Sequence, residues 1–183
     1  MSILGPTGGG RLVTSSDPDS ILAVQSEVQF RIDRGEFFTV GLAQLVPSNS
    51  AANVLIQVGD KPMHAVMAGS VAQNMNAELW EGTVFSDAGS GVIPYNRLRS
   101  SSNTSASTVT VAPTSANFGT RIFSTFIPGG SKGSANGGDA STFSEWVLQP
   151  NTNYLMRIIN NVVSPSTAGM ASISLDYYET DTT

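Results

Sequence analysis

"NYLMRIIN" (residues 153–160) and "ASISLDYY" (residues 171–178) are the two segments that decide the fold class of this 183-residue chain. In the first segment Tyr154, Met156 and Ile158 occupy alternate positions, and in the second segment apolar residues alternate with serine and aspartate. Side chains of an extended strand point to opposite faces in turn, so a period of two indicates a strand with one buried face. Both segments are therefore predicted to be strands of a sheet that covers a hydrophobic core.

The opposite face of the first segment carries Leu155, Arg157 and Ile159. This face is too apolar for a surface that meets only water. It is predicted to pack on a loop, on the N-terminal segment or on another subunit.

Alternating apolar residues recur along most of the chain, in short segments separated by Gly, Pro, Asn and Asp turns. No segment has a convincing apolar stripe at helical spacing. The segments at 63–71 and 76–85 are expected to form a hairpin through Gln73 and Asn74, and the polar tract Ser86–Ser107 is expected to be a loop. The remaining predicted strands are residues 27–33, 36–46, 53–59, 107–112, 120–127 and 144–149.

Together these segments predict about ten short antiparallel strands, which favours an all-β sandwich of jelly-roll type. The long connections at 86–107 and 128–142 suit Greek-key crossovers better than a simple meander. Residues 1–20 are rich in Gly, Pro, Ser and Asp and lack hydrophobic periodicity, so they are predicted to be a flexible, extended N-terminal arm. Residues 21–183 are predicted to be a single sandwich domain, which is a usual size for one domain.

Composition limits the classes of partner. Charged residues make up 13% of the chain, the net charge is -5, and the lysines and arginines are scattered. The chain lacks the positive stripe that neutralises a phosphate backbone, so nucleic acid is not an expected partner. It has no cysteine for disulfides or thiolate metal sites, and no signal sequence or apolar run of bilayer length. We therefore expect no membrane insertion and a cytosol-like compartment.

No set of residues meets the spacing that catalysis or ligand binding requires. Lys132 lies in the glycine-rich stretch "PGGSKGSANGGDAST", which lacks the G-K-[ST] end of a phosphate-binding loop. His64 is the single histidine, and a local hydrogen bond is its expected role. Glu78 and Glu81 flank Trp80, but residues three apart on a strand point to opposite faces, which defeats a glycosidase pair unless a bulge intervenes. The sequence therefore predicts no enzyme, no metal site and no cofactor.

Two arginines offer a partner contact. Arg97 and Arg99, in "YNRLRSSSN", could form a small positive spot that pairs with a carboxylate of a partner, and two solvated loop arginines are the alternative. Trp80 is expected to be a packing or interface aromatic, because tryptophan is enriched at subunit contacts.

Several motifs between about Gln25 and Glu179 have an order and spacing that resemble those of a known family of proteins. In chain order they are "FRIDRGEFFTV", "ELWEG", "SDAGSGVIPYNRLRSSS", "STVTVAP", "FIPGGSKGSANGGDAST" and "EWVLQPNTNYLMRIIN". This succession resembles the small all-β capsid decoration, or cement, proteins of tailed-bacteriophage virions.

The resemblance implies a jelly-roll subunit without catalysis, a homotrimer that sits on the capsid surface of a virion assembled in the host cytoplasm. There it would stabilise contacts between major capsid proteins. No known binding residue of the family transfers to this chain, and Leu98, between the two arginines, departs from the Asn/Arg-rich runs of the family. We expect partner contacts in the arm and at apolar or basic surface positions. These residues are Ile3, Leu4, Arg11, Leu12, Trp80, Arg97, Arg99, Leu155 and Ile159.

A second interpretation is a carbohydrate-binding β-sandwich of a tail or fibre, which would bind a receptor. Its sugar-stacking residues would be Trp80, Trp146, Tyr95 or Tyr177. Such a function requires exposed aromatic rings next to Asn or Asp side chains. Glycan binding would favour this interpretation, and co-migration with capsids would favour the first.

Overall fold

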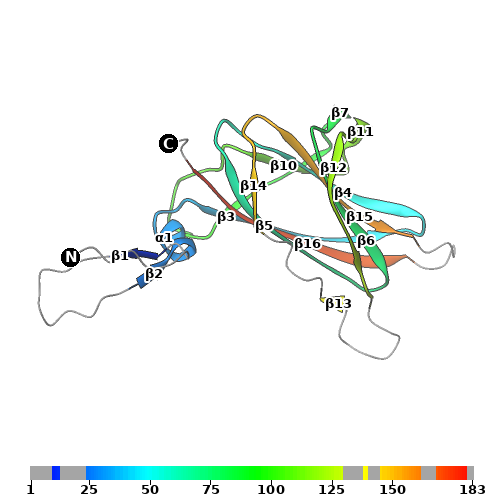
Figure 1. The fold of residues 1–183 in the computed structure, drawn as a ribbon, viewed down its shortest axis with the longest axis horizontal. Coiled ribbons are helices and arrows are strands. Elements are labelled where there is room, and N and C mark those ends of the chain that lie inside the picture. Colours follow the sequence, from blue (N-terminus) through cyan, green and yellow to red (C-terminus); the bar gives the residue numbers. More distant parts are fainter. Residues whose placement is uncertain (1–9, 13–23, 130–137, 140–144, 162–167, 181–183) are drawn as a thin grey trace, which may run out of the picture.

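The computed structural model describes residues 10–12, 24–129, 138–139, 145–161 and 168–180. Within these residues the chain folds into two antiparallel sheets that pack face to face, with one short helix beside them (Figure 1). This arrangement confirms the predicted all-β sandwich.

Each of the two main sheets contains six of the described strands. Sheet I has the order β13-β5-β16-β3-β9, and β14 also pairs with β5. Its strands are β3 (Phe37–Val46), β5 (Met63–Val71), β9 (Tyr95–Asn96), β13 (Gly138–Asp139), β14 (Trp146–Leu148) and β16 (Gly169–Glu179).

Sheet II has the order β12-β6-β15-β4-β10-β8. Its strands are β4 (Ser50–Gln57), β6 (Met75–Glu81), β8 (Ser90–Val92), β10 (Thr108–Val111), β12 (Thr120–Ile127) and β15 (Asn153–Asn160). Four further strands form two small ribbons outside the main sheets. They are β1 (Gly10–Leu12) with β2 (Val24–Ser26), and β7 (Val84–Asp87) with β11 (Thr114–Asn117).

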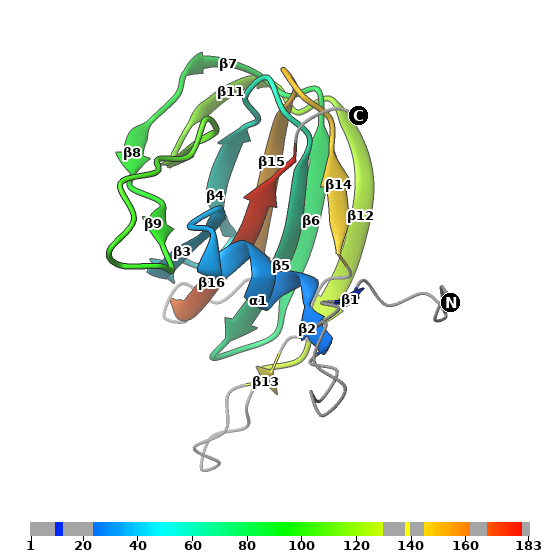
Figure 2. The ribbon, with the colours of Figure 1, turned by 90° about the vertical axis from the view of Figure 1, so that its left-hand side faces the viewer.

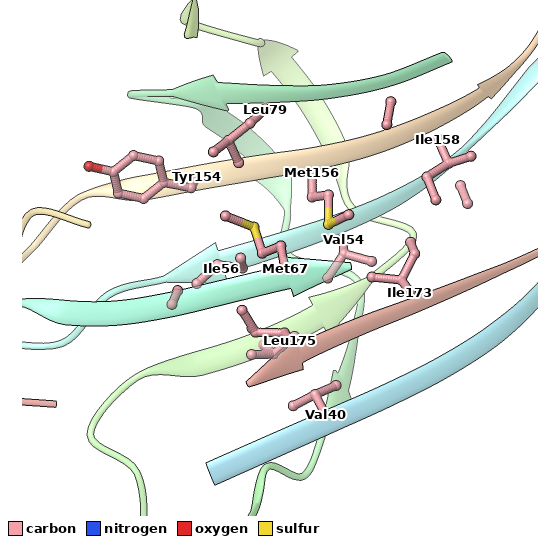
Figure 3. Close-up of a cluster of buried hydrophobic side chains, with 14 of the residues drawn as sticks. Val40, Val54, Ile56, Met67, Leu79, Tyr154, Met156, Ile158, Ile173 and Leu175 are labelled. Atoms are coloured by element: carbon pink, nitrogen blue, oxygen red, sulfur yellow. The ribbon is translucent and has the colours of Figure 1, made fainter. Parts of the chain in front are cut away.

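The core lies between the inner faces of the two sheets (Figure 3). On β15 the buried side chains include Tyr154, Met156 and Ile158, as the alternation predicted. Burying an aliphatic or aromatic side chain of this size contributes about 1.5–3 kcal/mol, so this layer holds the sheets together. The labelled side chains from the other strands are Val54, Ile56 and Leu79 of sheet II, and Val40, Met67, Ile173 and Leu175 of sheet I.

The predicted hairpin of 63–71 with 76–85 is wrong. The first of these segments forms β5 in sheet I, whereas the second forms β6 in sheet II, so the chain crosses between the sheets near Gln73. Alternation tells which face of a strand is buried, but it does not tell which strand pairs with which. Jelly-roll connectivity stays a prediction.

The predicted strand at 27–33 is wrong as well, because these residues form α1 (Glu27–Asp33). Ser26 caps the helix by accepting a hydrogen bond from the backbone N–H of Gln29, and Arg31 pairs with Glu27 one turn earlier. None of the residues of α1 is buried, so the alternation of apolar side chains did not mark a core face. Figure 2 shows α1 crossing one end of sheet I.

The helix ends at Asp33 with Arg34 as its C-cap, and the next residue, Gly35, has a φ of 67°. Its N–H donates to the carbonyl of Ile32, and the next N–H, that of Glu36, donates to the carbonyl of Arg31. This pair of bonds satisfies the last helical carbonyls and requires a left-handed residue at its centre. The chain then turns directly into β3.

The tract from Ser86 to Ser107 is not only a loop. It contains the end of β7, all of β8, which pairs with β10, and all of β9, which pairs with β3. These strands are two to four residues long, which is too short for an alternating pattern to be recognised. The step from β8 to β9 carries the chain from the edge of sheet II to the edge of sheet I.

Candidate interaction surfaces

The structure places the predicted partner-contacting residues in separate parts of the molecule. Ile3 and Leu4 lie outside the described residues. Arg11 and Leu12 belong to β1, whose backbone pairs with β2 rather than with either main sheet.

Trp80 and Leu155 come together on the outer face of sheet II, directly opposite each other on β6 and β15. Leu155 is fully buried. Phe118, from the turn after β11, packs on Trp80 with the ring centroids 5.5 Å apart. The outer face of β15 therefore packs on a loop of the same chain, which confirms one of the three predicted coverings. Ile159 is half-buried further along the same face.

A buried carboxylate organises this covered face. Glu78 accepts a hydrogen bond from Nε1 of Trp80 at 2.9 Å, and its oxygens lie 3.0 Å from Arg121 and 3.4 Å from Arg157. The Arg157 guanidinium lies 4.2 Å from the centroid of the Phe118 ring, and burial lowers the pKa of Arg157. The charges and ring faces of this cluster are thus engaged with one another.

Arg97 and Arg99 lie elsewhere, in the segment that follows β8. We call residues 93–99 the β9 loop. At its start Ile93 is 71% exposed, the highest value among the large hydrophobic side chains of the described chain, and Tyr95 is 55% exposed. The loop therefore carries an exposed isoleucine, an exposed tyrosine and two exposed arginines. Its strand β9 lies at one edge of the sandwich (Figure 2).

The backbone of the β9 loop is held firmly although its side chains are exposed. Asn96 is buried, donates from Nδ2 to the carbonyl oxygen of Gly35 at 2.7 Å and to that of Asn103 at 3.2 Å, and accepts from the N–H of Leu98. The N–H of Arg97 donates to the carbonyl of Phe37. A buried asparagine thus ties the loop to the turn after α1 and to the loop before β10.

Arg97 and Arg99 also differ in their partners from the other four arginines whose side chains the structure describes. Arg31, Arg34, Arg121 and Arg157 each form an ion pair with a glutamate. Across the part of the chain that the structure describes, no carboxylate lies within ion-pair distance of Arg97 or Arg99. Their guanidinium groups lie over aromatic rings instead, 5.3 Å from Phe37 and 5.2 Å from Tyr95 respectively.

His64 makes a hydrogen bond to a side chain that is distant in the sequence, whereas the sequence predicted a local bond. Its Nδ1 lies 3.3 Å from Oε1 of Glu145, and its ring stacks on Tyr178 at 4.7 Å. Burial raises the pKa of the Tyr178 phenol. These groups line a small cavity between α1 and sheet I, where Arg31 also lies over the ring of Tyr178.

The two glutamates beside Trp80 have different partners, as expected for residues three apart on a strand. Glu78 accepts from Trp80, whereas Glu81 accepts from the hydroxyl of Tyr154, a core residue. Over the described ranges, no group of three or more His, Asp or Glu side chains could hold a metal ion. Over the same ranges, no helix has the length and apolar character needed to cross a membrane.

Comparison of the chain with known protein families, with curated proteins and with solved structures finds no match. Any functional argument therefore rests on the surfaces of this molecule. Sequence reasoning identified Arg97 and Arg99 but overlooked Ile93, whose exposure depends on the tertiary fold. The signal that could have found it is an isoleucine immediately before Pro94, in a tract that is mostly polar.

Proposed function

We propose that this protein is a non-enzymatic structural subunit that binds the surface of a larger protein assembly. In its specific form, the proposal is a capsid decoration, or cement, protein of a tailed bacteriophage, with jelly-roll connectivity, that stabilises the shell of major capsid proteins. The observation that carries the proposal is the β9 loop, where exposed Ile93 and Tyr95 stand beside two arginines without a carboxylate partner among the described residues.

The side chains of the β9 loop are of the kinds that dominate protein interfaces. Tyrosine and arginine are enriched among interface residues whose truncation is costly, and an isoleucine can fill an apolar pocket. Because Asn96 already fixes the loop backbone, little conformational freedom is left to be lost on binding. A binding loop of this design favours a stable, specific contact over a transient one.

The chemistry of the loop also indicates the chemistry of the partner. Arg97 and Arg99 would each pair with a carboxylate, and Ile93 would enter an apolar pocket between those carboxylates. This positive spot is local, because the whole chain has a net charge of -5. The proposed partner surface on the capsid is therefore an apolar depression with an acidic rim.

A capsid offers many copies of one site, so a modest contact per subunit suffices where subunits are linked. The N-terminal arm, with Ile3, Leu4, Arg11 and Leu12, is the second contact that we propose with the capsid. The order of sequence motifs that resembles decoration proteins includes "VIPYNRLRSSS", the segment that forms the β9 loop.

The carbohydrate-binding alternative has less support. Trp80 packs on Phe118, Trp146 packs on Phe123 at the edge of the core, and Tyr177 is fully buried. Among the four aromatic residues considered for sugar stacking, Tyr95 has the exposed ring. A single ring that already carries the Arg99 guanidinium offers little surface for a sugar.

Co-sedimentation with capsids that lack this chain tests the proposal. We expect the full-length protein to bind, and Ile93→Ser and Arg97→Glu each to weaken binding at least about tenfold, which corresponds to about 1.4 kcal/mol. Val84→Ser is the matched control, because Val84 is also an exposed hydrophobic side chain, at 55%, and lies on β7, outside the β9 loop. Full occupancy by both loop variants would refute the assignment of the loop, and absence of binding by the unmodified protein would refute the capsid function.

A further inference from the structure

We infer that an open hollow on the outer face of sheet II, over β8 and β10, receives an aromatic side chain of the partner protein. The inference deepens the proposed function and rests on it in one respect, because the partner is the protein that the β9 loop binds. Sheet II has an internal twofold arrangement, in which the outer face of one half is filled by large side chains and that of the other half is open.

The strand order β12-β6-β15-β4-β10-β8 consists of two matching halves. At one end β12 pairs with β6, at the other end β8 pairs with β10, and the strand after β6 pairs with the strand after β10. The two halves meet between β15 and β4, where Leu155 lies opposite Leu55. This twofold relation matches residues 78–91, in order, with residues 108–121.

The turns of the two halves match in detail. After β6 the N–H of Gly82 donates to the carbonyl of Asn153, and after β10 the N–H of Ala112 donates to the carbonyl of Asn53. Both turn residues have a positive φ, 73° at Gly82 and 54° at Ala112. The backbones of the two halves therefore correspond, although their side chains differ.

One row of side chains crosses the outer face of both halves. In order across the sheet the row consists of Gly91, Thr110, Leu55, Leu155, Trp80 and Arg121. The two leucines at its centre are both fully buried. On one side of them the row continues with a tryptophan and an arginine, and on the other side with a threonine and a glycine.

Large side chains cover the outer face of the half that contains β6 and β12. Trp80 packs on Phe118, and the guanidinium of Arg121 lies 5.7 Å from the centroid of the Trp80 ring. Glu78 accepts from Nε1 of the same tryptophan. In the other half the residues that correspond to the tryptophan, phenylalanine, arginine and glutamate are, in that order, Thr110, Ala88, Gly91 and Thr108.

These smaller residues border an open hollow of about 540 Å³. Gly91, Thr108 and Thr110 line it from the sheet, and its lining also includes Ile93 and Pro94 of the β9 loop. Its volume lies within the range of about 300–1,000 Å³ that is usual for binding pockets. A partner that contacts Ile93 therefore reaches this hollow as well.

The lining of the hollow favours a neutral side chain with an apolar body and a polar edge. Among the described residues, none that lines the hollow is charged, so a charged side chain would lose its water without gaining a counter-charge. Val92, Ile93 and Pro94 supply apolar surface. The hydroxyl of Thr108 donates to Oε1 of Gln57, and its oxygen can still accept from another donor. An indole combines an apolar ring with an N–H that needs an acceptor when the ring is buried.

The filled half of the sheet shows such a ring in place. There the indole of Trp80 lies against a phenyl ring and a guanidinium, and its N–H donates to Glu78, the residue that corresponds to Thr108. The partner's ring would take the matching position in the open half, with a hydroxyl as acceptor instead of a carboxylate.

Two substitutions fill the hollow from within the chain. Gly91→Phe places a ring there, because a Cβ at Gly91 meets nothing within 4 Å and the corresponding Arg121 lies over Trp80. Thr108→Phe adds a ring from β10, at an exposed strand position. Gly41→Phe is the matched control, because a Cβ at Gly41 also meets nothing within 4 Å but belongs to β3 of sheet I.

The first measurement uses the full-length protein alone, with N-acetyl-tryptophanamide as the probe in NMR titrations. We expect saturable shifts of amide signals from the hollow for the unmodified protein and for Gly41→Phe. Gly91→Phe and Thr108→Phe should bind the probe at least about tenfold more weakly while thermal unfolding shows that they remain folded. N-acetyl-leucinamide should bind more weakly than the tryptophan probe. Absence of saturable shifts, equal affinity for the leucine probe, or unchanged binding by both filled variants would each overturn the inference.

The second measurement repeats the capsid co-sedimentation with the same variants. We expect Gly91→Phe and Thr108→Phe to weaken binding at least about tenfold, and Gly41→Phe to bind like the unmodified protein. Full binding by both filled variants would overturn the assignment of the hollow to the partner. Binding of the tryptophan probe without binding of capsids by the unmodified protein would refute the capsid function and support the aromatic site, so the two failures are distinguishable.

Discussion

The buried carboxylate on the outer face of sheet II allows a quantitative prediction, made for Glu78→Ala. Glu78 accepts from Nε1 of Trp80 and lies within ion-pair distance of Arg121 and Arg157. The substitution removes the acceptor and both charge pairs at once. Its effect on the free energy of unfolding can be worked out contact by contact.

The two arginines contribute unequally because their exposure differs. The side chain of Arg157 is 17% exposed and that of Arg121 is 52% exposed. Leaving a buried partner without its counter-charge costs about 3–5 kcal/mol, whereas an exposed pair contributes about 0–1 kcal/mol. Arg157 keeps its hydrogen bond to Asn53, so we expect a loss near the lower limit, about 3 kcal/mol.

In thermal unfolding, about 3 kcal/mol corresponds to a fall in Tm of roughly 6–12 °C for a chain of this length. Urea unfolding of Glu78→Ala, Glu78→Gln and Arg121→Ala measures the free energies directly. Glu78→Gln keeps an acceptor for Trp80 and should fall between the other two variants. A loss below about 1 kcal/mol for Glu78→Ala, or an equal loss for Arg121→Ala, would refute this account of the cluster.

Two further predictions concern the backbone and a phenol of the core. Gly35→Ala should lower the free energy of unfolding by more than Gly82→Ala. Both glycines have a positive φ, which costs about 1–2 kcal/mol for an alanine, but the new Cβ at Gly35 would also clash with the side chain of Ser101, whereas a Cβ at Gly82 meets nothing within 4 Å. Equal losses in urea unfolding would contradict this. Burial raises the pKa of Tyr154 to about 12, whereas a tyrosine of the unfolded chain has a pKa of about 10. As the pH rises from about 10 towards about 12, the unfolded state loses this proton first, so the free energy of unfolding should fall. Tyr154→Phe should make this fall shallower without abolishing it, since burial also raises the pKa of Tyr177, and an unchanged slope would contradict the assignment.

The long strands could be predicted from sequence because each has one face in the core. Over 153–160 and 171–178 the alternation of apolar residues matches the buried positions of β15 and β16. The apolar outer face of β15 was also a correct signal, since Leu155 on this face is fully buried and the neighbouring Arg157 lies over the Phe118 ring. In both cases burial itself selects the residue types, so the pattern is visible in the sequence.

The helix could not be predicted in the same way. Residues 27–33 alternate like a strand, but α1 buries none of them, so the alternation carried no information about a core. The forces that select the helix are local. They are the cap from Ser26, the ion pair between Arg31 and Glu27, and the hydrogen bond from Gln29 to Asp33. Strand pairing could not be predicted either, because alternation reports only which face of a strand is buried. The strands β5 and β6 have the same alternation although they lie in different sheets.

The candidate binding surface shows most clearly what tertiary structure adds. In the sequence Arg97 and Arg99 look like the other scattered arginines. The fold separates them. The six arginines whose side chains the structure describes all lie near an aromatic ring, but four of them also pair with a glutamate, and Arg97 and Arg99 do not. An arginine paired with a glutamate must give up or share that partner to bind another protein. An arginine that lies over a ring and has no carboxylate partner can donate to a carboxylate of another protein and keep its stacking. A partner carboxylate would therefore displace fewer existing contacts at the β9 loop than at the covered face of sheet II, although that face contains Trp80, which the sequence suggested as an interface residue.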